Sequence, residues 1–352
     1  MTADPNKLQV LLARILGDVG ATATAALVVL GDRLGLYKAL AEGGTMTPAE
    51  LALRTDLCER YVREWLSAQA AAGYIEYDAA KGRFSMTAEQ ATAFSDENGP
   101  AFMPGAFQLF ASLFIDEAKI AEAFRTGQGV GWHEHHPCLF HGTERFFRPG
   151  YASYLIDAWI PALEGVKAKL DRGAAVADVG CGHGASTILM AKAFPKSRFV
   201  GFDYHWASVE RAREAARDAG VEDRAFFEVA SAKSYPGRSY DLVTFFDCLH
   251  DMGDPVGAAT HVRSTLSPGG SWMIVEPFAN DELADNINLV GRIYYAASTM
   301  ICTPASLSQE VGLGLGAQAG ERRLRDVVTE AGFGTFRRAS ETPFNLVFEA
   351  RP

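Results

Sequence analysis

The chain has 352 residues, of which 48% are apolar and 22% charged, and its net charge is −10. This composition is ordinary for a soluble globular protein of two or three domains, and the lack of a basic excess argues against nucleic acid as the main partner. The longest apolar stretches are far shorter than the roughly 20 residues of a membrane span, and the N-terminus lacks a signal-peptide pattern. We therefore expect a cytoplasmic protein with no membrane partner.

The first 94 residues predict a winged-helix domain. Residues 7–42 place apolar side chains at helical spacing. Thr47, Pro48 and Glu50 form the capping box of a short helix over 48–54, and a second helix over 58–72 precedes a hairpin-like alternation. Such a domain binds DNA or mediates dimerisation. Because residues 1–90 carry nine basic and eleven acidic side chains, dimerisation is the better interpretation.

A helical connector rich in aromatic residues is expected over 95–171. It contains four of the eight histidines, His133, His135, His136 and His141. The cluster could be a lid that brings imidazoles to a substrate, a polar surface loop or a metal site. Pro137 interrupts the segment and no second cluster completes a metal shell, so we expect no metal and place His133 and His136 at the substrate.

From residue 172 onward, short apolar runs alternate with amphipathic segments, which predicts a doubly wound α/β sheet. The first strand ends in a loop with Asp178, Gly180, Gly182 and Gly184, whose glycines allow a close approach to a ligand at a helix N-terminus. The spacing GxGxG differs from the GxGxxG of dinucleotide binders, so a nicotinamide oxidoreductase is disfavoured. Asp203 ends the second strand, where it can accept hydrogen bonds from a ribose.

Four segments, "VADVGCGHG", "FVGFD", "YDLVTFFDCLHDMGDP" and "LSPGGSWMIVEP", resemble class I S-adenosylmethionine-dependent methyltransferases over residues 172–352. With the winged helix, the chain is most similar to small-molecule methyltransferases of the caffeic-acid O-methyltransferase type. The resemblance implies a Rossmann-like sheet of order 3-2-1-4-5-7-6 with strand 7 antiparallel, and a ligand at the carboxyl ends of strands 1 to 4. It also implies a homodimer through the N-terminal domain.

The resemblance further implies S-adenosyl-L-methionine as cofactor, S-adenosyl-L-homocysteine as product, and a small-molecule methyl acceptor. Gly180, Gly182 and Gly184 would pass under the methionine part, Asp178 would orient the loop or the cofactor amine, and Asp203 would take the ribose. Further cofactor contacts would come from Ser231 and Ala232 near the adenine, Asp247 near the methionine part, and Tyr151 as a closing aromatic. For Asp247, a helix cap is an equal alternative.

His250 in "LHDMGD" aligns with the histidine that serves the family as general base, and Glu276 aligns with the carboxylate that orients it. A histidine titrates near working pH and suits proton removal, although a helix-capping role stays open. The family's second flanking carboxylate is unclear, with Gln318 or Glu321 near its place. Tyr294 and Tyr295 would line the acceptor pocket, or belong to the core. A second hypothesis is a cofactor-binding transcriptional regulator with little or no catalysis.

Overall fold

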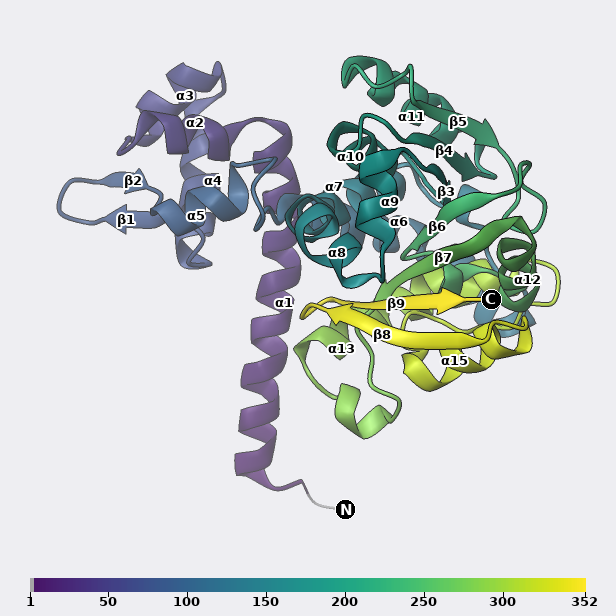
Figure 1. Cartoon of the computed structure of the whole chain (residues 1–352). Helices are drawn as coiled ribbons and strands as arrows, with labels where there is room; N and C mark the ends of the chain where they lie inside the picture. The colour runs from purple at the N-terminus through teal and green to yellow at the C-terminus, as the bar shows by residue number, and fades with distance from the viewer. Residues whose placement is uncertain (1–2) are drawn as a thin grey trace. The chain divides into compact units, whose positions relative to one another are not determined.

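The computed structural model describes residues 3–352 (Figure 1). The chain forms two compact units, which are treated separately below. One comprises residues up to Ala111 together with His141–Pro149, and the other comprises Ser112–Phe140 together with Gly150–Pro352. The helices α6 (Pro104–Thr126) and α7 (Cys138–Tyr154) contribute to both units.

The first unit has a winged-helix fold. Its elements are α1 (Pro5–Arg33), α2 (Leu36–Gly43), α3 (Pro48–Thr55), α4 (Glu59–Ala71), the antiparallel strands β1 (Glu76–Asp78) and β2 (Arg83–Ser85), and α5 (Ala88–Phe94). The helix predicted over 7–42 is two helices, because Gly35 between them adopts a φ of 69°. The predicted capping box is present: the Glu50 N–H donates to Thr47 Oγ1 and the Thr47 N–H donates to Glu50 Oε2, at 3.3 and 2.7 Å.

The core of the first unit joins its helices to the hairpin. Two polar contacts within it fix α4: Tyr37 donates to Gln69 Oε1 at 2.6 Å, and the Trp65 indole donates to the Leu27 carbonyl at 2.9 Å. The buried apolar side chains are Val28, Leu36, Tyr37, Leu40, Leu51, Ala52, Val62, Trp65, Leu66, Ile75, Phe84 and Phe94.

The N-terminal half of α1 exposes a long apolar surface. Val10 and Leu16 are 73% and 70% exposed, and Leu8, Leu11, Leu12, Ile15 and Val19 are also exposed. By length and composition alone α1 is apolar enough to cross a membrane, and 6% of its most apolar window is buried. The sequence predicted this helix but not its apolar length, because its glycines, alanines and threonines interrupt the run of large apolar residues. A helix packed against a second chain has the same appearance.

The second unit holds the remaining elements. The helical ones are η1 (Trp132–Glu134), η2 (Leu155–Trp159), α8 (Ile160–Ala162), α9 (Val166–Arg172), α10 (Ala185–Ala193), α11 (Trp206–Asp218), η3 (Leu249–Asp251), α12 (Pro255–Thr265), η4 (Leu283–Asn286), α13 (Leu289–Ala297), η5 (Ser298–Cys302), α14 (Thr303–Leu307) and α15 (Gly320–Glu330). The strands are β3 (Ala175–Val179), β4 (Arg198–Asp203), β5 (Ala225–Val229), β6 (Tyr240–Phe246), β7 (Leu266–Pro277), β8 (Thr335–Glu341) and β9 (Asn345–Arg351).

These strands form one sheet in the order β5-β4-β3-β6-β7-β9-β8 (Figure 1). The pairs from β5 to β7 are parallel, whereas β9 runs antiparallel to both of its neighbours. In the numbering of the domain's own strands this is the predicted order 3-2-1-4-5-7-6 with strand 7 antiparallel, so the predicted fold class is confirmed. Parallel strands end at a common edge, and the order changes direction at β3, which places a crevice beside its carboxyl end.

The sheet is covered by apolar helix faces. On one side α12 and α15 pack together and contribute Ala258, Val262, Leu324 and Val328 to a fully buried cluster. Phe245 and Trp272, on the adjacent strands β6 and β7, meet edge to face in the same cluster at 5.0 Å between ring centroids. The helices α10 and α11 contact each other and the strands β4 and β5. This rigid layer fixes where the loops at the carboxyl edge emerge.

Candidate active site

The loop between β3 and α10 turns through three glycines with positive φ: Gly180 at 75°, Gly182 at 51° and Gly184 at 80°. A Cβ atom at Gly180 would lie 2.7 Å from Cys248 Sγ, and one at Gly184 would lie 2.7 Å from the Phe227 ring. At Gly182, a Cβ atom would meet none of the described residues within 4 Å. Gly182 therefore exposes bare backbone to open space, as the approach of a ligand requires.

Asp178 lies beneath this loop rather than in it. It is almost fully buried, and its carboxylate accepts hydrogen bonds from Ser186 at 2.7 Å, Thr187 at 2.5 Å and Thr244 at 3.0 Å. Burial raises the pKa of Asp178 to about 6, although the three hydroxyls oppose that shift. This geometry ties the first turn of α10 to β3 and β6, which favours loop orientation over contact with a cofactor amine.

Asp203, at the end of β4, joins the glycine loop to the next turn. Its Oδ2 accepts the Gly182 N–H at 2.9 Å, and its Oδ1 accepts the His205 N–H at 2.8 Å. Burial raises the pKa of Asp203, and the two backbone hydrogen bonds oppose the rise. Because each carboxylate oxygen has two lone pairs, Asp203 keeps acceptor capacity toward the crevice.

The loop after β5 runs beside Asp203, because the Ala230 N–H donates to the Asp203 carbonyl at 3.0 Å. Ser231 is exposed and Ala232 is partly buried. Sequence reasoning placed both residues near an adenine, and the structure brings them to the same edge as the glycine loop.

Asp247 follows β6 with a φ of 50°, in the left-handed region that asparagine and aspartate tolerate best among non-glycine residues. Its Oδ2 accepts the Tyr151 hydroxyl at 2.7 Å, and its Oδ1 accepts the Asn345 amide at 3.0 Å. Burial is the main cause that raises the pKa of Asp247 to about 8, and the negative charge of Glu276 is the second. Asp247 does not cap a helix: its side-chain hydrogen bonds run to Tyr151 and Asn345, on other elements.

His250 lies in the turn η3 and is buried. Its Nδ1 is 2.5 Å from Glu276 Oε2, and Glu276 Oε1 accepts the Leu249 N–H at 3.0 Å. On the other side of the ring, Nε2 is 3.1 Å from Asp251 Oδ1. Burial alone would lower the pKa of His250, but the charges of Asp251 and Glu276 outweigh it and raise the pKa well above its usual value.

Cys302 also faces this histidine. It ends the π-helical turn η5, and its Sγ, an Asp251 oxygen and a His250 ring nitrogen all lie within 4.8 Å of one another. Burial is the main cause that raises the pKa of Cys302 to about 12, so the thiol is un-ionised at neutral pH. Cys302 was not among the residues predicted for the site, since a single cysteine 52 positions from His250 gives no sequence signal.

The two residues considered for the family's second flanking carboxylate have other contacts. Glu321 forms ion pairs with Arg325 and Arg338, at 2.5 and 2.7 Å. The Gln318 amide donates to the Phe278 carbonyl at 3.0 Å, while its buried Oε1 has no hydrogen-bond partner among residues 3–352. Glu321 is therefore committed to the surface of α15, and Asp251 is the second carboxylate at the histidine.

The histidine-rich segment is ordered by side-chain contacts within the second unit. The exposed His133 places Nδ1 3.5 Å from the Tyr204 hydroxyl, beside Asp203. The ring of His136 accepts the Cys138 N–H at 3.2 Å and so caps the start of α7. Within residues 3–352, the side chains whose ligand atoms group at metal-binding distances do not include the histidines of this segment.

His135, which sequence reasoning did not select, is the buried member of the cluster. Its Nδ1 lies 3.1 Å from Asp116 Oδ2, on α6. The contact joins two residues that are 19 positions apart and lie on separate helical segments. The sequence therefore drew attention to the histidine cluster but could not show which of its histidines is buried against Asp116.

Tyr294 and Tyr295 differ in environment. Tyr294 is buried, and its hydroxyl donates to the Phe344 carbonyl at 2.7 Å. Burial is the main cause that raises the pKa of Tyr294, and the charge of Asp247 raises it further. Tyr295 is only partly buried.

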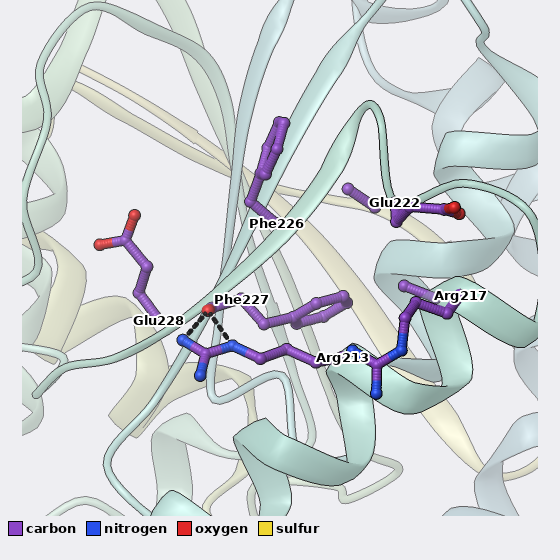
Figure 2. A pocket seen from close by; sticks show the side chains of 8 residues that line it. Arg213, Arg217, Glu222, Phe226, Phe227 and Glu228 are labelled. Atoms are coloured by element: carbon purple, nitrogen blue, oxygen red, sulfur yellow. Dashed lines mark hydrogen bonds between the residues drawn. The ribbon is translucent and has the colours of Figure 1, made fainter.

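A separate surface pocket lies between α11 and the edge strand β5 (Figure 2). Arg213 spans it and donates to the Phe227 carbonyl at 2.9 and 2.7 Å, so its cation covers the open edge of β5. Arg217, Glu222 and Glu228 mix both signs of charge around the 40% exposed Phe226. The residues that line this pocket include none of the candidate site residues.

Two family models match the chain. Residues 170–332 match the model described as a methyltransferase domain, and residues 22–95 match the one described as an Rv2258c-like winged HTH domain. A curated relative, the 27-O-demethylrifamycin SV methyltransferase of Amycolatopsis mediterranei (strain S699), is 37% identical over 131 residues. The match spans 35% of this chain and 48% of that protein, so the chain covers about half the length of this relative.

Solved structures resemble the chain over nearly its full length. The mitomycin 7-O-methyltransferase MmcR has a TM-score of 0.70 at 16% identity, covering 99% of this chain and 100% of that one. The human N-acetylserotonin methyltransferase, solved with S-adenosylmethionine, has a TM-score of 0.68 at 17% identity, covering 99% and 98%. At these identities the likeness concerns the fold. The chain therefore resembles a winged helix-turn-helix domain over residues 22–95 and a methyltransferase domain over residues 170–332, and its sheet has the class I methyltransferase topology.

Proposed function

We propose that the protein is an S-adenosylmethionine-dependent methyltransferase that acts on a hydroxyl group of a small molecule, with His250 as the general base. The observation that carries this proposal is the buried His250–Glu276 pair, which lies at the same sheet edge as the glycine loop and Asp203. The relative and neighbour named above as O-methyltransferases support the oxygen acceptor.

The residues of the crevice fit the cofactor. Gly182 leaves room for a ligand against its backbone, and Asp203 has acceptor capacity for ribose hydroxyls. We further assign Ser231 and Ala232 to the adenine side, and Asp247 with Tyr151 to the methionine side. When bound, the cofactor supplies a sulfonium methyl group that is already electrophilic.

The task left to the protein is to align the acceptor hydroxyl and remove its proton. Glu276 accepts a hydrogen bond from Nδ1 of His250, which leaves Nε2, on the side of Asp251, as the basic nitrogen and stabilises the imidazolium that forms. A positioned base contributes about 10²–10⁴ in rate. We assign the buried Tyr294, whose hydroxyl donates to the Phe344 carbonyl, to the lining of the acceptor pocket.

We also propose that the protein is a cytoplasmic homodimer joined through the first unit. The exposed apolar surface of α1 supports the dimer, because burying it against a second copy removes it from water.

Ion pairs on α4 argue against the alternative function, a cofactor-binding transcriptional regulator that binds DNA through the winged helix. On α4, which would be the recognition helix, Arg60 pairs with Glu64 at 2.6 Å and Arg63 pairs with Glu59 at 2.5 Å. Two of the cations that could contact phosphate are thereby neutralised on their own helix.

The test is calorimetric titration with S-adenosylmethionine and S-adenosylhomocysteine, followed by methyl transfer from labelled cofactor to a panel of phenols and alcohols. We expect both cofactor forms to bind and His250→Ala to lower transfer by at least about 100-fold with cofactor affinity retained. His261→Gln, on α12, is the control and should keep full activity. Absence of cofactor binding would refute the proposal, and full activity of His250→Ala would refute the base.

A further inference from the structure

Three side chains with metal-binding atoms meet on one side of the His250 ring. His250 Nε2 is 3.1 Å from Asp251 Oδ1. One such atom from each of His250, Asp251 and Cys302 lies within 4.8 Å of the other two, and the Cys302 side chain interacts with both neighbours. The mechanism above uses the histidine as a base but gives no task to the thiol.

The three atoms can share one cation. Because Glu276 accepts a hydrogen bond from Nδ1 of His250, the neutral imidazole has its lone pair on Nε2. Asp251 Oδ1 is buried and, when the carboxyl is ionised, offers only lone pairs. The two atoms repel each other at 3.1 Å unless a proton or a metal ion lies between them. Cys302 adds a third lone-pair atom at the same place.

The separations of these atoms suit a tetrahedral zinc ion. Zinc binds histidine nitrogen and carboxylate oxygen at about 2.0–2.2 Å and thiolate sulfur at about 2.3 Å, which places such ligand atoms about 3.3–3.6 Å apart. The observed nitrogen–oxygen distance of 3.1 Å and the limit of 4.8 Å for all three pairs lie on either side of this range, so modest side-chain rotations complete the site. A set of imidazole, thiolate and carboxylate prefers zinc to magnesium or calcium.

The surroundings of His250 also match those of a zinc ligand. A metal-bound histidine usually donates its other ring N–H to a carboxylate, as His250 does to Glu276 at 2.5 Å. Glu276 is held in turn by the Leu249 N–H at 3.0 Å. His250 and Cys302 are buried, whereas the side chain of Asp251 is 21% exposed. Asp251 is therefore the side from which a cation can enter.

We propose that His250 Nε2, Asp251 and Cys302 Sγ form a zinc(II) site, in which the ion displaces the thiol proton to solvent and keeps one coordination position open. The expectation of no metal was drawn from the histidine-rich segment, which contributes no ligand here. A bound ion would occupy the lone pair with which His250 accepts a proton, so zinc would inhibit methyl transfer. This inhibition, unlike the binding, rests on the proposed function.

Metal titration of the full-length, chelator-treated protein tests the site without an acceptor. Calorimetry measures zinc binding, and cobalt(II) is the spectroscopic probe, because a cobalt–thiolate bond absorbs in the near ultraviolet. The variants are Cys302→Ser, Asp251→Asn and Glu276→Gln. Two controls remove other thiols: Cys58→Ser, at an exposed cysteine, and Cys138→Ser, beside the histidine-rich segment. Circular dichroism checks that each variant folds.

We expect zinc to bind the wild type, and the cobalt absorption to be lost in Cys302→Ser and kept in both controls. Glu276→Gln should weaken zinc binding by about 10–100-fold, and Asp251→Asn, which loses a ligand, by at least as much. These two variants carry the test if Cys302→Ser does not fold. A wild type that binds no zinc, or zinc affinity that is unchanged in the folded variants, overturns the proposal.

Methyl transfer separates this result from the proposed function. The rate of each protein with zinc is compared with its own rate in chelator. Zinc should inhibit the wild type and Cys58→Ser alike, while Cys302→Ser should need about tenfold more zinc or beyond for the same inhibition. Zinc binding that depends on Cys302 but leaves transfer unaffected supports the site and refutes His250 as the base. An active enzyme that binds no zinc refutes the site and leaves the proposed function standing.

Discussion

The Nδ1 atom of His250 lies 2.5 Å from Oε2 of Glu276, and both side chains are buried. The two residues are 26 positions apart and meet because β6 and β7 are parallel neighbours that end at the same edge. Glu276 also accepts the Leu249 N–H, so the turn that carries the histidine is fixed to the strand that carries its partner.

This contact predicts how transfer depends on pH. The base must be unprotonated, and Asp251 and Glu276 raise the pKa of His250 above its usual value against the opposing effect of burial. Activity of the wild type should therefore rise with pH through neutrality and level off above the raised pKa. Glu276→Gln removes one of the two charges, so the rising limb should move to lower pH while the plateau falls by about 10–100-fold through lost orientation. A pH profile of kcat/KM measures both effects. If the rising limb of Glu276→Gln lies at the same pH as that of the wild type, His250 is not the base that Glu276 holds.

Asp203 gives a prediction about cofactor affinity. Hydrogen bonds to a charged group contribute about 1.5–3 kcal/mol each, so Asp203→Ala should weaken S-adenosylmethionine binding by at least about tenfold per lost bond. The Gly182 N–H would also lose its acceptor, which loosens the loop. Calorimetry measures the change. Asp218→Asn, an exposed acid on α11, is the matched control and should bind as the wild type does.

Asp247 predicts a pH-dependent stability. Its folded-state pKa is raised to about 8 from 3.8, so between these values the folded protein holds a proton that the unfolded chain has released. The stabilisation is complete below the lower value and is lost as pH rises toward 8, at up to about 1.4 kcal/mol per pH unit. Asp247→Asn has no charge to release and tolerates the left-handed backbone.

The unfolding free energy of Asp247→Asn relative to the wild type should therefore increase between pH 5 and 8. Denaturant titrations at several pH values give this difference. Asp218→Asn should show a constant offset over the same range. If the difference in unfolding free energy between Asp247→Asn and the wild type is also constant from pH 5 to 8, the Asp247 carboxyl is ionised in the folded protein.

Much of the second unit could be predicted because its signals are local. The glycine loop, the acid after β4 and the short apolar runs each occupy one stretch of sequence, and the parallel sheet order follows from the family they resemble. The roles of Asp251, Cys302 and His135 could not be predicted in this way. Asp251 adjoins His250 in the chain, but its side-chain contact is not encoded in the motif. Cys302 and His135 depend on contacts between segments far apart in the sequence, and the His135–Asp116 contact joins α6 to the segment before α7.

The first unit shows the same limit. Thr47 and Glu50 predicted a helix start because a capping box is encoded within four residues. The apolar character of the N-terminal helices was visible in the sequence, but the exposure of α1 was not, since exposure depends on what packs against a helix and periodicity does not reveal that.

That face of α1 carries the last prediction. Val10 and Leu16 are 73% and 70% exposed, and a charge at either would be costly to bury in a dimer interface. Val10→Glu with Leu16→Glu should convert a dimer to a monomer in light scattering, while the circular dichroism of the protein stays unchanged because neither side chain supports the fold. Arg14→Glu, on the same exposed stretch, alters charge without removing apolar area and should leave the dimer intact. A wild type that is monomeric at tens of micromolar, or a double variant that stays dimeric, would rule out α1 as the interface, and association of the wild type with lipid vesicles would assign its apolar face to a membrane surface instead.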